Sequence, residues 1–312
     1  MNRVLLLAVL ALATLPVRAQ EYRIDAATPA GLRELLRATG EPLPLLSAHR
    51  GGAGPGWPEN CLATFAETLR HGWAILEIDL RTTRDGVHVL MHDATLDRTT
   101  DGTGPVRERT WAELRELRLK DRNGKLTPHR IPSLDEVMTW ARGRALLALD
   151  KKEVPVAEVV RVITHHRAES YALFMAYTAK EAKEVHAANP EIMMEVMLGT
   201  PARFDEFVAT GVPWDRVIAF VGHTPTPDRE LCRRIVAKGA NCMAGTSRNL
   251  DLEVLRGRVK PDAAWWAGYR ALLERDVAVI ETDVPRELAP WLRGGGTPAG
   301  TGRGRFLRFV GP

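Results

Sequence analysis

The chain is poor in cysteine, with only Cys61, Cys232 and Cys242 among its 312 residues. So few thiols exclude a disulfide-rich scaffold, and their spacing matches no cysteine-based metal site. In an exported protein the odd number leaves at least one thiol free. Cys232 and Cys242 could pair, but the simpler expectation is that all three are small buried side chains.

Long apolar runs are absent after the N-terminus. Residues 4–15 are almost entirely apolar, Arg3 precedes them, and Val17 and Ala19 put small side chains at positions −3 and −1 of a cleavage site. These features predict a signal peptide over residues 1–19, cleaved before Gln20. A buried helix or an uncleaved anchor is the alternative. No later stretch approaches the ~18 apolar residues of a membrane span. We therefore expect a secreted or periplasmic protein without stable membrane insertion.

Neither sign of charge dominates. The 43 basic and 39 acidic residues give a net charge of +4, and removing residues 1–19, with two arginines and no acid, leaves +2. Nucleic-acid binders concentrate Lys and Arg far more strongly. We therefore expect a small-molecule substrate and no nucleic-acid partner. The oligomeric state stays open.

Apolar segments typical of strands alternate with helical patterns along most of the chain. The expected strands are 45–48, 74–80, 145–149, 173–177, 192–198, 217–221, 241–244 and 277–282. Eight such βα units predict an α/β fold, a (β/α)8 TIM barrel spanning residues 44–292.

Three segments fall outside that repeat. Residues 20–43 form a lead-in with a short helix, and residues 93–131, after a short strand at 87–91, form an inserted subdomain with little strand pattern. Residues 293–312 are Gly/Arg-rich and aperiodic, which predicts a disordered tail.

Glu77 and Asp79 are separated by one residue inside the apolar run 74–80. On a strand they share one face, about 6.5 Å apart, so both carboxylates can bind one hard cation. Without a cation the buried pair would be mutually repulsive. The pattern predicts a metal site, and an outward-facing ion pair is the alternative.

Further polar residues end or follow the expected strands. They are His49 and Arg50 after the first, His92 after the short strand, and Asp150 followed by Lys152 after the third. Catalytic groups of a barrel gather at the carboxyl ends of its strands. Carboxylates, cationic side chains and two histidines suit metal-assisted cleavage of a phosphate ester. All-oxygen ligation by Glu77, Asp79 and Asp150 favours Ca²⁺ or Mg²⁺.

Other residues allow two interpretations each. Glu195 alternates with methionines in 193–197 and could line the barrel mouth as a substrate-binding residue. Asp93 could orient His92 or accept a hydrogen bond within its own turn. Glu59 could support the site or complement a helix dipole, and Asn60 is expected to cap the next helix.

These residues resemble the motifs of the glycerophosphodiester phosphodiesterase family. The matching segments are His49-Arg50-Gly51, Pro58-Glu59-Asn60, Glu77-Ile78-Asp79, His92–Gly104, Ile131–Glu136 and, more weakly, Ile280–Pro285. The resemblance covers about residues 44–290 and is more specific in the N-terminal half. It implies a barrel with an inserted subdomain, and cleavage of glycerophosphodiesters into sn-glycerol 3-phosphate and an alcohol with Ca²⁺ or Mg²⁺.

The resemblance also implies roles for individual residues. His49 and His92 match the catalytic histidines, and Glu77, Asp79 and Asp150 match the metal ligands. Arg50 and Lys152 match phosphate-contacting positions.

Three features depart from the family pattern. Asp150 stands where Glu is usual, Cys61 stands where Thr is usual, and residues 241–247 lack a Trp-Thr pair that bears on headgroup contacts.

We assign His49 as general base and His92 as general acid, an order that the sequence leaves open. The attacking group is either water or a hydroxyl of the substrate, which would form a cyclic phosphate. One alternative is a phospholipase D-like lipid phosphodiesterase acting by intramolecular transfer. The other is a non-catalytic module that binds phosphate esters or cations.

Overall fold

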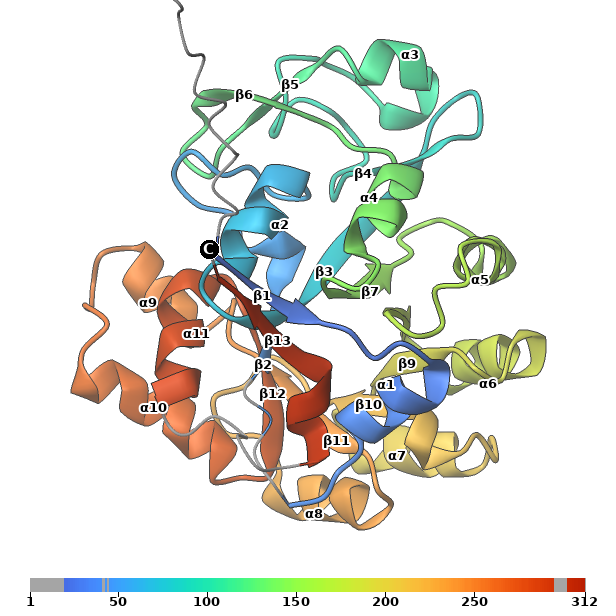
Figure 1. Cartoon of the computed structure of the whole chain (residues 1–312), viewed down its shortest axis with the longest axis vertical. Coiled ribbons are helices and arrows are strands. Elements are labelled where there is room, and N and C mark those ends of the chain that lie inside the picture. The colour runs from blue at the N-terminus through green and yellow to red at the C-terminus, as the bar shows by residue number, and fades with distance from the viewer. Residues whose placement is uncertain (1–19, 41–42, 44, 295–301, 312) are drawn as a thin grey trace, which may run out of the picture.

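The computed structural model describes residues 20–40, 43, 45–294 and 302–311. Its centre is a closed barrel of eight parallel strands. Figure 1 shows helices arranged around these strands. The barrel strands are β2 (Leu45–Ala48), β3 (Trp73–Thr82), β7 (Leu146–Asp150), β8 (Ala172–Ala176), β9 (Met193–Met197), β10 (Val217–Phe220), β11 (Asn241–Gly245) and β12 (Val277–Thr282). Strand β2 pairs with β12 on one side and with β3 on the other, which closes the sheet. The predicted (β/α)8 barrel is confirmed.

Helices connect successive barrel strands or, in one case, follow the last one, and they cover the outside of the barrel. They are α2 (Leu62–Leu69), α4 (Leu134–Ala141), α5 (Val156–His165), α6 (Ala179–Ala188), α7 (Pro201–Val208), α8 (Arg229–Ala237), α9 (Leu250–Leu255), α10 (Ala263–Leu273) and α11 (Pro285–Gly294). Each strand is covered on both faces, which explains why β7 and β8 consist entirely of buried residues.

Local sequence signals set several helix starts. The side chains of Thr110 and Ser133 accept hydrogen bonds from the backbone N–H groups of Glu113 and Glu136, whose carboxylates accept bonds from the two caps in return. At α6 the Thr178 side chain accepts from the backbone N–H of Glu181, but the Glu181 carboxylate accepts from the backbone N–H of Tyr177, so the cap is not reciprocal.

A two-stranded ribbon lies at the N-terminal end of the barrel. It pairs β1 (Glu21–Ile24) antiparallel with β13 (Leu307–Val310), next to α1 (Pro29–Leu36) and the 3₁₀ helix η4 (Gly302–Phe306). The Trp73 indole at the start of β3 donates to the Arg308 carbonyl at 3.1 Å. The ribbon therefore closes the end of the barrel opposite the strands' carboxyl ends.

This ribbon corrects the prediction of a disordered tail. Arg293 belongs to α11, and the described residues 302–310 form η4 and β13. Phe306 and Leu307 are buried against the barrel. Two apolar residues in a Gly/Arg-rich stretch give no periodicity, so the pattern hid them. The predicted signal peptide lies outside the described residues.

The segment 93–131 lies between β4 (His88–Leu90), which extends β3 as an antiparallel edge, and α4. It contains a 3₁₀ helix, η2 (Val106–Glu108), helix α3 (Trp111–Leu114) and a hairpin of β5 (Arg118–Lys120) with β6 (Leu126–Arg130). Figure 1 shows these elements together at one end of the molecule. The hairpin was not expected, because β6 is mostly polar and contains Pro128.

The insertion has its own small core. Its buried members are Cys61, Val89, Met91, Leu96, Val106, Leu114, Leu119 and Ile131. Because Cys61 precedes α2 and Val89 lies in β4, this core fixes the insertion to the barrel.

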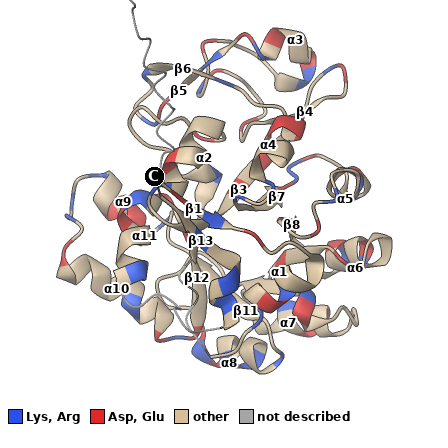
Figure 2. Ribbon diagram, in the orientation of Figure 1, with Lys and Arg blue, Asp and Glu red and all other residues tan. Residues whose placement is uncertain are grey.

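Within the described part of the chain, no helix is long and apolar enough to cross a bilayer. Figure 2 shows basic and acidic residues interspersed over the whole molecule. The three cysteines are buried and unpaired.

Candidate active site

A cavity of about 670 Å³ opens at the carboxyl ends of the barrel strands. Most residues singled out from the sequence line it: His49, Arg50, Glu77, His92, Asp150, Lys152 and Glu195. Asp79 is outside this lining and is only 1% exposed, but it contacts Lys152. The fold thus brings together residues that are as much as 146 positions apart in the sequence.

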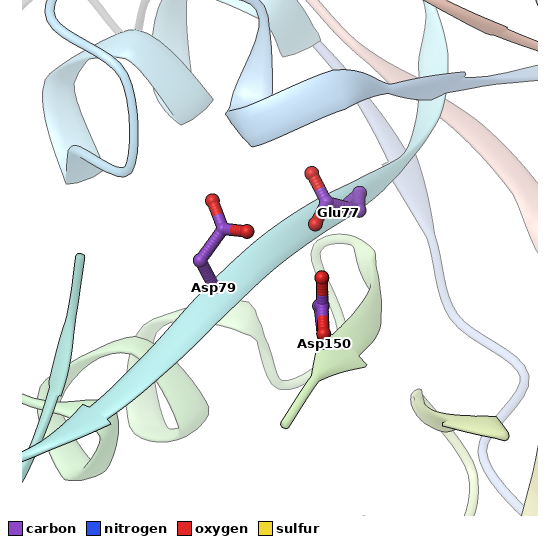
Figure 3. Close-up of side chains that lie close together, drawn as sticks. All are labelled: Glu77, Asp79 and Asp150. Atoms are coloured by element: carbon purple, nitrogen blue, oxygen red, sulfur yellow. The ribbon is translucent and has the colours of Figure 1, made fainter. Parts of the chain in front are cut away.

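Glu77, Asp79 and Asp150 converge, as Figure 3 shows. Asp79 pairs in register with Asp150 on the neighbouring strand, and Glu77 lies two residues earlier on the same face of β3. Each offers a carboxylate oxygen, and these oxygens lie within 4.8 Å of one another. Three buried oxygen donors fit a hard divalent cation such as Ca²⁺ or Mg²⁺. The shorter side chain of Asp150 therefore still reaches the cluster.

Burial and mutual repulsion dominate the electrostatics of this triad. Burial raises the pKa of Glu77 well above its usual range, and the charge of Asp79 adds to the shift. The Glu77 carboxylate accepts a hydrogen bond of 2.6 Å from the backbone N–H of Arg50. The Lys152 ammonium lies 2.7 Å from Asp79 Oδ1 and also contacts Asp150.

Two of the cationic residues occupy unusual backbone conformations. Arg50 and Lys152, both just after a barrel strand, have φ angles of +52° and +45°. Left-handed conformations cost non-glycine residues free energy and are concentrated at functional sites. At Arg50 this conformation lets the backbone N–H face Glu77.

His49 is held by Asp283, which follows the last barrel strand. Its Nδ1 lies 2.8 Å from Asp283 Oδ1, and Arg122 of the insertion lies 3.5 Å from the same oxygen. Burial alone would lower the pKa of His49, but the Asp283 hydrogen bond and the charges of Glu77 and Glu281 outweigh it and raise this pKa to about 10. The arrangement fixes the imidazole and leaves Nε2 available.

His92 is held in a parallel way. Its Nδ1 lies 2.7 Å from Asp93 Oδ1, so Asp93 orients the ring. Arg98 of the insertion binds Asp93 at 2.6 Å and also Glu59, which in turn lies 3.3 Å from Arg50. The insertion therefore supplies an arginine to support each histidine–aspartate pair.

Asn60 corrects an expectation. Its side chain caps no helix: Cys61 occupies the cap position of α2, and Asn60 has φ +54°. The Asn60 amide instead donates to Asp79 Oδ2 at 2.7 Å and accepts from the Asp79 backbone N–H at 3.0 Å. Asn is a preferred cap residue, so its position before a helix favoured the wrong partner.

Sequence reasoning also missed Asp283, Tyr177 and Glu281 as site residues. The Tyr177 hydroxyl donates to Asp150 Oδ2 at 2.8 Å, and Glu281 lines the cavity. A signal for two of them was present, because Glu281 and Asp283 alternate at the end of the last expected strand as Glu77 and Asp79 do at theirs. Tyr177 gave no comparable signal.

The profile of the glycerophosphoryl diester phosphodiesterase family matches residues 49–283. The chain belongs to this family. The crystal structure of a glycerophosphoryl diester phosphodiesterase from Parabacteroides distasonis matches this chain with a TM-score of 0.87 and 35% sequence identity. The match covers 93% of this chain and 100% of that one. The earlier resemblance is thereby confirmed.

Other members match less completely. Glycerophosphodiester phosphodiesterase 1 of Bos taurus is 50% identical over 70 residues, which are 22% of this chain and only 21% of the bovine protein. An Oleispira antarctica phosphodiesterase in complex with the product sn-glycerol-3-phosphate shares the fold, with a TM-score of 0.58 and 20% identity over 84% of this chain and 99% of that one.

Proposed function

We propose that the chain hydrolyses glycerophosphodiesters to sn-glycerol 3-phosphate and an alcohol. The observation that carries the proposal is that two aspartate-held histidines and a carboxylate triad lie around one cavity. Membership of the family supports it, as does the product named for the Oleispira relative. A cavity of about 670 Å³ lined mostly by charged and polar residues suits a small polar diester better than a lipid.

Each group has a role that its surroundings allow. Arg50 and Lys152, which line the cavity, would hold the phosphate oxygens. His49 would take the proton of the attacking oxygen, and His92 would protonate the leaving alcohol. Since the charge of Glu77 helps to raise the pKa of His49, a cation held by Glu77 would lower that pKa toward the range a base needs.

Glu77, Asp79 and Asp150 would hold Ca²⁺ or Mg²⁺, the hard cations that all-oxygen donor sets prefer. Such an ion, when bound, supplies Lewis-acid stabilisation of charge on the phosphoryl oxygens. Lys152 then provides the remaining positive charge beside Asp79 and Asp150.

We also propose that the chain is exported and processed before Gln20. The cut would leave β1 intact, because that strand begins at Glu21. N-terminal sequencing of protein recovered outside the cytoplasm tests this directly, and a mature protein that still begins at Met1 would contradict it.

Activity is tested by the release of sn-glycerol 3-phosphate from glycerophosphoethanolamine and glycerophosphocholine. We expect EDTA to abolish release, and Ca²⁺ or Mg²⁺ to restore it. The His92→Ala variant should lose about 10²–10⁴-fold in kcat, the usual contribution of a positioned acid or base. His165→Ala, an exposed histidine far from the cavity lining, is the matched control.

Two results would contradict parts of this proposal. Turnover that survives thorough chelation removes the cation from it, and near-normal turnover by His92→Ala removes the acid–base assignment. Cleavage of lysophosphatidylcholine with a cyclic phosphate product, and no release from the glycerophosphodiesters, would favour the phospholipase D-like alternative.

A further inference from the structure

Two buried glutamates of the cavity have no part in the reaction described so far. Glu195 on β9 is 0% exposed, and neither of its carboxylate oxygens has a hydrogen-bond partner among the described residues. Glu281 on β12 is 3% exposed, and its side chain likewise bonds to no described residue. Both line the cavity. We call this pair the floor glutamates.

Two other buried acids, by contrast, have polar partners. Asp251 accepts from the Tyr269 hydroxyl, the Thr282 hydroxyl and the backbone N–H of Asp283. Asp79 is bound by Asn60. A buried carboxylate without a partner is costly and rare in native proteins. Because the floor glutamates line the cavity, a molecule bound there is the natural source of the missing donors.

The pair is electrostatically coupled. Burial raises the pKa of Glu195 well above its usual range, and among the neighbouring charges Glu281 contributes most, followed by Glu77. A positively charged ligand beside them would oppose this shift, because an opposite charge favours the ionised form of a carboxyl group. The coupling therefore favours a cationic ligand over a neutral one.

An organic cation suits the pair better than a second metal ion. In the described residues, the one cluster of three metal-ligating side chains whose donor atoms lie within 4.8 Å of one another is Glu77, Asp79 and Asp150, and the floor glutamates are outside it. No third His, Cys, Asp or Glu side chain of the described residues joins the floor glutamates in such a cluster, so we consider an organic cation. Unpaired carboxylate oxygens need N–H or O–H donors, and a primary ammonium group combines N–H donors with a positive charge, whereas a quaternary ammonium group has no N–H donor. The apolar side chains of Met175, Met197 and Phe220 in the same cavity would contact its methylene groups.

We propose that Glu195 and Glu281 bind a primary ammonium group, so that the preferred substrates are phosphodiesters of amino alcohols such as ethanolamine. This inference rests on the proposed phosphodiesterase function and names its substrate class. In this proposal the carboxylate of Glu195 on β9 binds the ammonium group, and the carboxylate of Glu281 on β12 binds the same group.

The test compares kcat/KM for three substrates that all release sn-glycerol 3-phosphate. They differ only in the alcohol: glycerophosphoethanolamine has a primary ammonium, glycerophosphocholine a quaternary one, and glycerophosphoglycerol a neutral diol. We expect the wild-type chain to prefer the ethanolamine diester at least 10-fold over each of the others. In Glu195→Gln and in Glu281→Gln the preference over glycerophosphoglycerol should fall below 3-fold.

Glu253→Gln makes the same chemical change at a partly exposed position outside the cavity, and it should keep the wild-type preference. A second measurement needs no turnover: ethanolamine should raise the Tm of the wild-type chain, and choline and glycerol at the same concentration should not. Because it uses the wild-type chain, this measurement still tests the ammonium subsite if Glu195→Gln or Glu281→Gln fails to fold.

The outcomes separate the two proposals. Equal kcat/KM values for the three substrates, or a preference for choline or glycerol, overturn the ammonium subsite and leave the phosphodiesterase intact. An unchanged preference in both floor variants overturns it as well. Release from none of the three substrates, with Ca²⁺ or Mg²⁺ present, overturns the phosphodiesterase and the subsite together.

Discussion

At the scale of single residues, the site depends on side chains that hold other side chains. Asp283 holds His49, Asp93 holds His92, and Asn60 holds Asp79. None of these three supports is itself a proposed acid, base or ligand. The proposed chemistry needs each reactive group in one orientation, and this second set of contacts provides it.

The Asp283→Asn variant tests this positioning. Asn keeps the shape but removes the charge that helps to raise the pKa of His49, so the part of the pH profile due to His49 should move to lower pH. We expect kcat to fall by roughly 10- to 100-fold, less than the ~10²–10⁴-fold expected for losing the imidazole. Steady-state kinetics across pH measures both effects. Asp205→Asn, an exposed aspartate on α7, should change neither.

At the scale of elements, α2 begins without the cap its family usually has. Cys61 occupies the cap position, and its side chain makes no capping hydrogen bond. A Thr hydroxyl there could accept a bond from the first turn. We expect Cys61→Thr to raise the free energy of unfolding by about 0.5–1 kcal/mol, measured by denaturant titration. Cys61→Val has the same branched shape without the hydroxyl and should give no such gain.

The insertion is tied to the barrel by Arg98. The hydrogen bond from Arg98 lowers the pKa of Asp93, and bonds and charge from Arg98 and Arg50 outweigh burial to lower that of Glu59. A carboxylate with a lowered folded-state pKa stabilises the fold above its unfolded pKa, about 4 for both types, and this contribution is lost as pH falls further.

The Arg98→Gln variant should therefore have a lower Tm than wild type at pH 5–8, and the difference should shrink below about pH 4. Thermal unfolding across pH measures the difference. Arg109→Gln changes another exposed arginine of the insertion, 4.0 Å from its nearest carboxylate, and should have little effect. A Tm difference that persists unchanged into acid would show that Arg98 acts through packing instead.

At the scale of the whole molecule, stability and chemistry lie at opposite ends of the barrel. The proposed catalytic groups are at the carboxyl ends of the strands, whereas the β1–β13 ribbon and α1 close the other end. Such a division is typical of barrel enzymes. It predicts that changes at the ribbon affect folding and leave turnover alone.

The Phe306→Ala variant tests this division. Phe306 is 7% exposed against the closed end, and removing its ring should lower the free energy of unfolding by about 3 kcal/mol. Phe309 on the same ribbon is 51% exposed, so Phe309→Ala should cost less than about 1 kcal/mol. Denaturant titration measures both variants. The kcat of folded Phe306→Ala should equal that of wild type, and a large fall would contradict the division.

The sequence predicts most of the barrel, because each of its strands is a short apolar run and polar groups follow several of them directly. His49, Glu77, Asp79, His92 and Asp150 could be found this way. What stayed hidden depends on partners distant in the chain. Asp283 contacts His49 across 234 positions, and β13 needs β1 to become a strand. Asn60 was misassigned because its local role as a cap was plausible and its actual partner, Asp79, lies on a strand 19 residues away.

The pairing of β1 with β13 has a consequence for how the chain matures. Glu21 pairs with Val310, so a strand at one end of the sequence has no partner until the other end is synthesised. Until then β1 is an unprotected edge, the kind of surface on which chains aggregate. A chain that ends before Leu307 would keep every group proposed for catalysis and still present that edge. Loss of the last few residues should therefore be observed first as aggregation or proteolysis of the chain, and only afterwards as a loss of catalytic activity.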